Sequence, residues 1–156
     1  MAEDFPFQNV VPIRVLHVDD EAAHLEITRI FLNRESKGDF DIVSVLSAED
    51  ALEKLENEYF DVVVSDCKMP GMNGLDFLDA VRHTERYAGI PFILFTSADK
   101  SKVMNDALKF GVVRYIAKKG NPSIQCNLLA RVIYELTLKV ASVRTVHRYK
   151  YLSTSL

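Results

Sequence analysis

Residues 13–21 read IRVLHVDDE, a run of six mostly apolar residues that ends at three consecutive acids. Short β-branched runs of the same kind recur four more times, and segments with helical spacing separate them. The five runs are Ile13–Val18, Phe40–Val45, Asp61–Ser65, Pro91–Phe95 and Val112–Ile116. Several of them are nearly continuous apolar stretches, which is typical of strands that are buried on both faces of a sheet.

Between these runs, apolar residues recur at the spacing of an amphipathic helix. In the second such segment one apolar face stands at positions i, i+3, i+4 and i+7, formed by Ala48, Ala51, Leu52 and Leu55. Ser47, with Asp50 three residues later, predicts a capping box at the start of this helix. Asn121 followed by Pro122 predicts the N-cap and the first residue of the last helix. The chain therefore alternates five strands with five helices.

This alternation predicts an α/β fold, a flavodoxin-like (βα)5 three-layer sandwich with helices on both faces of a parallel sheet. The expected strand order is 2-1-3-4-5, and in such sheets ligands bind outside the carboxyl ends of the strands, where the order reverses. We expect residues 13–140 to form the domain, 1–12 an N-terminal extension and 141–156 a C-terminal helix extension or linker. The chemistry is expected between the ends of the first and third strands.

The composition is typical of one soluble domain. The chain has 156 residues, of which 48% are hydrophobic and 26% charged, and its formal charge of −3 gives no bulk attraction to nucleic acid. No apolar run approaches the roughly 20 residues of a membrane helix, and the acidic start lacks the basic flank of a signal peptide. Cys67 and Cys126 form no Cys-x-x-Cys and are expected to be reduced thiols. These features predict a cytoplasmic protein with no nucleic-acid partner and no membrane insertion.

Acidic side chains follow two of the predicted strands. Asp19 and Asp20 come directly after the first strand, and Asp66 comes directly after the third. Because the ends of these strands meet at one edge of the sheet, the three carboxylates are expected to converge, and their repulsion calls for a cation. Carboxylate oxygens with open water positions suit Mg²⁺, for which Mn²⁺ can substitute. The sequence therefore predicts a divalent metal site.

Polar side chains also follow the fourth and fifth strands. Thr96 and Ser97 end the fourth strand, and Lys118 follows the fifth. Taken singly, each residue has an ordinary structural explanation: Asp19 or Asp20 could cap a helix, and a lysine is most often solvated. Their coincidence at the ends of four different strands favours a site that stabilises a phosphoryl group with metal, ammonium and hydroxyl.

Four motifs of the chain resemble the receiver domains of two-component response regulators. They are LHVDDE at 16–21, DCKMPGMNG at 66–74, FTSAD at 95–99 and RYIAKKG at 114–120. The resemblance extends from Ile13 to about Ile133. It implies a phosphoacceptor that takes a phosphoryl group from a histidine kinase or phosphotransfer protein. It implies a signalling domain rather than an enzyme, one that catalyses only its own phosphorylation and dephosphorylation.

The resemblance also implies a role for each site residue. Asp66 corresponds to the phosphoacceptor and, with the acidic pair and the backbone carbonyl of Lys68, to a metal ligand. The implied roles of the others are Mg²⁺ binding for Asp19 and Asp20, phosphoryl binding for Lys118, and phosphoryl binding or switching for Thr96, Ser97 and Tyr115. Tyr115 is expected to turn inward when Thr96 moves toward the phosphoryl group.

The expected output surface is the face of the fourth helix, the fifth strand and the fifth helix, which would bind a downstream protein or output domain. A homodimer is also possible if Leu136, Val140 and Val143 extend the last helix. At Lys119 the chain departs from the common family pattern, which places proline after the lysine. We therefore expect a trans peptide between Lys118 and Lys119, with Lys118 facing the site and Lys119 facing solvent.

Three alternatives compete with the phosphoacceptor interpretation. A phosphatase of the haloacid-dehalogenase type needs a second acid two residues after its nucleophile, where this chain has Lys68. A nucleotide-binding module needs a glycine-rich phosphate loop, and neither G-x-x-x-x-G-K-[ST] nor G-x-G-x-x-G follows any strand. A receiver-like domain that is never phosphorylated remains open, although the intact acids argue against it.

Overall fold

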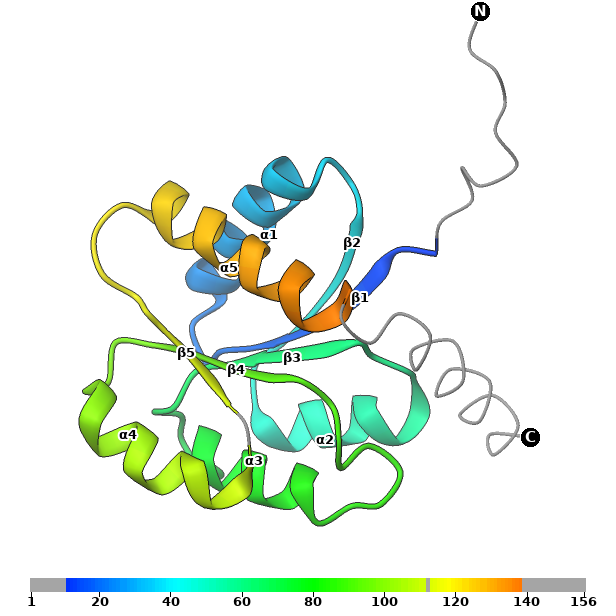
Figure 1. Cartoon of the computed structure of the whole chain (residues 1–156), viewed down its shortest axis with the longest axis vertical. Helices are drawn as coiled ribbons and strands as arrows, with labels where there is room; N and C mark the ends of the chain where they lie inside the picture. Colours follow the sequence, from blue (N-terminus) through cyan, green and yellow to red (C-terminus); the bar gives the residue numbers. More distant parts are fainter. Residues whose placement is uncertain (1–10, 112, 139–156) are drawn as a thin grey trace, which may run out of the picture.

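The computed structural model describes residues 11–111 and 113–138 (Figure 1). Its strands are β1 (Ile13–Val18), β2 (Phe40–Val45), β3 (Val62–Ser65), β4 (Phe92–Thr96) and β5 (Arg114–Ala117). Its helices are α1 (Ala22–Ser36), α2 (Ala48–Asn57), α3 (Gly74–Arg82), α4 (Lys100–Ala107) and α5 (Pro122–Leu138), with a short 3-10 turn, η1 (Leu108–Phe110). The predicted order of strands and helices is confirmed.

All strands pair in parallel, in the order β2-β1-β3-β4-β5. Figure 1 shows α1 and α5 on one face of this sheet and α2, α3 and α4 on the other. The flavodoxin-like three-layer sandwich is therefore confirmed. Because all five strands run the same way, their carboxyl ends lie along one edge of the sheet.

The core consists of two apolar layers, one on each face of the sheet. In β3, Val62 and Val64 pack in the layer beneath α1 and α5, whereas Val63 packs in the opposite layer. All three side chains have no exposed area. The continuous apolar runs of the sequence thus reflect strands that are covered on both faces.

Three of the predicted strands have boundaries that were wrong by one or two residues. The strand predicted at Asp61–Ser65 begins at Val62: Asp61 N–H still donates to Arg14 O at 2.9 Å, but Arg14 N–H donates to the Asp61 carboxylate, at 2.8 Å, and not to a backbone carbonyl. Pro91 has no N–H to donate, so β4 begins at Phe92 and continues through Thr96. The strand predicted at Val112–Ile116 is Arg114–Ala117, which pairs with β4 as far as Thr96.

The predicted helix starts are confirmed. Ser47 Oγ accepts a hydrogen bond from Asp50 N–H at 3.1 Å, and Asn121 Oδ1 accepts one from Ser123 N–H at 2.8 Å. No helix within residues 11–111 and 113–138 is long and apolar enough to cross a membrane. The N-terminal extension up to residue 10, the predicted continuation through Val140 and Val143, and the segment 141–156 lie outside the described residues.

Candidate functional site

The three predicted aspartates come together at the edge of the sheet. β1 and β3 are neighbours, with Val18 opposite Ser65, and Asp66 N–H donates to Val18 O at 3.0 Å. This pairing brings Asp66 beside Asp19 and Asp20, so that one carboxylate oxygen from each lies within 4.8 Å of the other two. The predicted convergence of like charge is confirmed.

The two members of the acidic pair differ in environment. Asp19 has no exposed area; its Oδ1 accepts from Glu21 N–H at 2.9 Å, and its Oδ2 binds Lys118 Nζ. Asp20 is exposed. Both oxygens of Asp19 are therefore engaged by the protein, whereas the carboxylate of Asp20 faces solvent and is open to an ion.

Lys118 joins the ends of three strands. Its Nζ contacts Asp19 Oδ2 and lies 3.2 Å from Asp66 Oδ2, and its side chain is only 11% exposed. The backbone N–H of Lys118 donates to Thr96 O at 2.9 Å, which fixes the residue at the end of β5. Lys119 is exposed, and every peptide bond in the described residues is trans. The predicted trans peptide and the opposite directions of the two lysines are confirmed.

Asp66 is held in place by the start of α3. Its Oδ1 accepts from Cys67 N–H at 2.7 Å, and Gly74 N–H donates to Cys67 O at 2.8 Å. A Cβ on Gly74 would lie 2.1 Å from Asp66 O and 2.8 Å from Cys67 Cα. Only glycine lets the helix approach the strand this closely. Gly74 had no role of its own in the sequence analysis, which missed this contact.

The hydroxyl side chains of the site are bonded to the turn after β4. Thr96 is buried, and its Oγ1 accepts from Ala98 N–H at 3.1 Å. Tyr115 O–H donates to Ala98 O at 2.6 Å, and Lys100 Nζ lies 5.9 Å from the centre of the tyrosine ring. Burial raises the pKa of Tyr115, so the phenol stays protonated and can donate. Ser97 is exposed.

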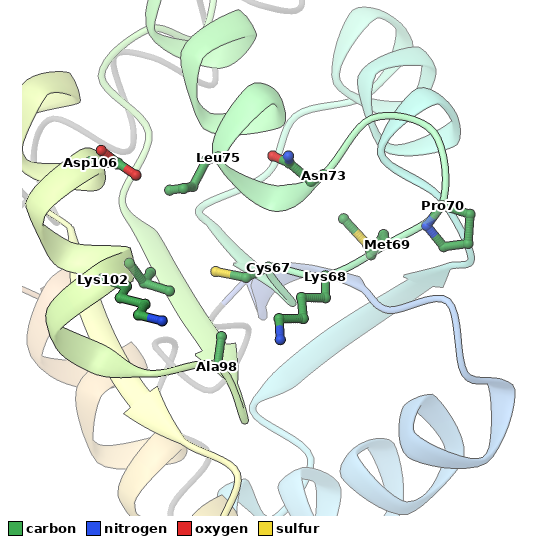
Figure 2. A pocket seen from close by; sticks show the side chains of 10 residues that line it. Cys67, Lys68, Met69, Pro70, Asn73, Leu75, Ala98, Lys102 and Asp106 are labelled. Carbon is green, nitrogen blue, oxygen red and sulfur yellow. The ribbon is translucent and has the colours of Figure 1, made fainter.

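A groove of about 570 Å³ opens beside Asp66. Figure 2 shows Lys68, Met69 and Pro70 along one side of it and Ala98 and Lys102 along the other. Cys67 lies between them, and burial raises the pKa of its thiol to about 11. Cys67 and Cys126 are both free and buried. At neutral pH Cys67 is a protonated, apolar part of the wall rather than a nucleophile.

Two histidines near the site were not assigned to it from the sequence. His24 Nδ1 lies 3.7 Å from Asp19 Oδ2 and 3.5 Å from Glu21 Oε2. His17 is buried below the acids, and burial lowers its pKa to about 4, so its imidazole is neutral. The contact between Asp19 and His24 could be predicted only if the start of α1, which lies between them, were known.

The oxygen donors fit a hard divalent cation. Asp20 and Asp66 offer carboxylates to the space that they border, and Lys68 is two residues from Asp66 in the loop that follows β3. Oxygen ligands with room for water are those that Mg²⁺ prefers.

A family model described as the response regulator receiver domain matches residues 15–132. The chain belongs to this family. Receiver domains are signalling modules of two-component systems, which receive their input from a kinase or phosphotransfer protein and act on downstream partners.

Several known receiver proteins are similar to this one. The chemotaxis protein CheY1 of Helicobacter pylori is 34% identical over 113 residues, which are 72% of this chain and 90% of that protein. The response regulator Rre1 of Synechocystis is 31% identical over 124 residues, 77% of this chain and 53% of that one. The structure of CheY4 from Vibrio cholerae superposes with a TM-score of 0.67 at 26% identity, covering 78% of this receiver domain's chain and 98% of its own.

Proposed function

We propose that this receiver domain accepts a phosphoryl group on Asp66 from a histidine kinase or phosphotransfer protein. The observation that carries the proposal is the convergence of Asp19, Asp20 and Asp66 within 4.8 Å, with Lys118 Nζ 3.2 Å from the Asp66 carboxylate. Three acids and one buried ammonium are costly to assemble for structure alone. The arrangement suits phosphoryl transfer, which needs a nucleophilic oxygen and positive charge around it.

The metal in this proposal is Mg²⁺, for which Mn²⁺ can substitute. Asp20, Asp66 and the backbone carbonyl of Lys68 would hold it directly. Asp19 would complete the acidic pair at the ion, because its oxygens, like those of Asp66, each accept one hydrogen bond and keep a further lone pair. When bound, the ion supplies positive charge to the oxygens of the transferred group.

In the transfer step, a carboxylate oxygen of Asp66 attacks phosphorus while the bond from phosphorus to the donor breaks. With a phosphohistidine donor this is a P–N bond, and the imidazole leaves with its electron pair and takes up a proton. Lys118 neutralises charge on the transferred oxygens, since its Nζ already contacts Asp66. The product is an aspartyl phosphate, and the domain catalyses only its formation and hydrolysis.

The phosphoryl group then acts on the turn after β4. It adds close to two negative charges beside Thr96 and Ser97. If the Thr96 hydroxyl turns to donate to the phosphoryl group, it gives up the hydrogen bond that it accepts from Ala98 N–H. Ala98 also accepts a hydrogen bond from Tyr115, so the change can pass to this tyrosine. The change would reach the face of α4, β5 and α5, where we propose that a downstream protein, an output domain or a second copy of the chain binds. We place this signalling in the cytoplasm.

Treatment with acetyl phosphate tests the proposal. Intact-protein mass spectrometry should show one added phosphoryl group with MgCl₂ or MnCl₂, and none with excess chelator or in Asp66→Asn. An adduct that forms equally well in chelator, or that survives Asp66→Asn, would mean that the site is misassigned. A wild-type chain that never reacts would favour a receiver domain that binds partners without phosphorylation.

A further inference from the structure

Glu49 reaches from the first turn of α2 to the loop between β3 and α3. Its Oε1 accepts a hydrogen bond from Met72 N–H at 3.1 Å. The same oxygen lies 3.1 Å from the place where a Cβ on Gly71 would stand, and Gly71 has a φ of +74°. Glu49 therefore binds this loop at Met72, and the absence of a side chain at Gly71 leaves room for the carboxylate.

The loop, residues 67–73, has packing on one side and open space on the other. Toward α4 it borders the groove of about 570 Å³ (Figure 2). Within the loop, Met69 is buried and Asn73 caps α3 by accepting from Asp76 N–H. Glu49 holds the stretch between these two anchors, which includes Gly71, from α2. The Lys68 carbonyl belongs to the same loop and directly precedes the Met69 anchor, so its position depends on how this stretch is held.

We propose that Glu49 is a positioning residue, which fixes this loop so that the Lys68 carbonyl is ready to bind the metal. The inference rests on the proposed function, because it assigns that carbonyl and Asp66 to one ion. If the loop that carries a ligand carbonyl is mobile, the ion must order it on binding. The entropy lost in this ordering lowers the affinity for the metal. Glu49 is exposed, and its carboxylate restrains the loop through the one hydrogen bond that it accepts from Met72 N–H.

The chain offers a matched control in Asp50. Asp50 is the next residue in the same helical turn, so Asp50→Ala removes an equal charge near the helix N-terminus. Its side chain borders a separate hollow at the end of β2. A second variant, Glu49→Gln, keeps an oxygen that can accept from Met72 N–H but removes the charge.

Calorimetric titration with MgCl₂ of the whole chain tests the proposal. Glu49→Ala should bind Mg²⁺ about 3- to 10-fold more weakly, as expected for the loss of one hydrogen bond. Glu49→Gln and Asp50→Ala should stay within about 2-fold of the wild type. In hydrogen exchange without metal, the Met72 amide should exchange faster in Glu49→Ala than in either control, which a loss of helix stability alone would not produce.

Three results would overturn the proposal: unchanged affinity in Glu49→Ala, equal weakening in Asp50→Ala, or a Glu49→Gln variant as weak as Glu49→Ala, which would indicate charge rather than position. Different results would refute the proposed function itself. If the wild type binds no Mg²⁺, or if Asp66→Asn binds it equally well, the metal site itself is misassigned.

Discussion

Two groups of side chains share the carboxyl edge of the sheet, yet they make different contacts. The charged rim (Asp19, Asp66 and Lys118) is already joined, because the lysine contacts both acids. The hydroxyl rim (Thr96 and Tyr115) is bonded instead to the backbone of Ala98. Under the proposed function this difference gives the two rims separate roles: the charged rim would carry out the transfer, and the hydroxyl rim would pass the change to the turn after β4.

Removal of Lys118 should have the largest effect on this comparison. Lys118→Ala leaves the fully buried Asp19 without its cation and should destabilise the fold by about 3 to 5 kcal/mol. It should also abolish the response of the hydroxyl rim to phosphorylation. Lys119→Ala, an exposed neighbour, should change stability by less than about 0.5 kcal/mol. Chemical denaturation measures the loss of stability, and amide exchange at Ala98 measures the response to phosphorylation. If Lys119→Ala had the larger effects, Lys119 and not Lys118 would be the residue that faces the site.

Gly74→Ala tests whether the charged rim depends on the close approach of α3. The new Cβ would meet Asp66 O at 2.1 Å, so the backbone that carries Asp66 must shift. We expect a loss of stability of about 1 to 3 kcal/mol or more, together with slower phosphorylation by acetyl phosphate. Gly89→Ala is the control, since a Cβ there has no neighbour within 4 Å. Equal behaviour of the two variants would show that the approach has no role.

Thr96→Val should separate the two rims. The exchange removes the acceptor for Ala98 N–H and should cost about 1 to 2 kcal/mol, while the charges around Asp66 remain. Mass spectrometry should still find a phosphoryl group on the protein, but amide exchange in α4 should no longer change when it is added. If α4 responds as in the wild type, the Thr96 hydroxyl does not carry the signal.

Tyr115→Phe should have the smallest effect. It removes the donor to Ala98 O but keeps the ring, and it should cost about 1 kcal/mol or less. Phosphorylation should proceed at the wild-type rate, and the exchange of the Ala98–Lys100 segment should be faster before phosphorylation. A slower phosphoryl transfer would instead place Tyr115 among the groups that act on Asp66.

The contrast between the rims also marks what the sequence could predict. Asp19, Asp20, Asp66, Thr96 and Lys118 could be placed at one edge because parallel strands end there, and strands are recognised from short apolar runs. What each side chain contacts depends on loop conformation, which no periodicity encodes. Three features needed the structure: the difference in exposure between Asp19 and Asp20, the close packing of Gly74 against the backbone of Asp66, and the separate hydrogen bonds of Thr96 and Tyr115 to Ala98.

The predictions of the strand boundaries were wrong for a related reason. A run of apolar letters does not say where the hydrogen-bond ladder begins, which is decided by the lack of an N–H at Pro91 and by the register of β5 against β4. An error of one or two residues at these ends leaves the site intact, because Thr96 and Lys118 still lie at the same edge of the sheet.

Reductive trapping tests whether Asp66 carries the phosphoryl group. Borohydride converts an aspartyl phosphate to homoserine, so tandem mass spectrometry of the protein treated with acetyl phosphate and Mg²⁺ locates the modified residue. We expect homoserine at position 66 alone, and none when chelator is present. Homoserine at position 19 or 20, or a phosphoryl group on the protein that leaves residue 66 an aspartate, would contradict it.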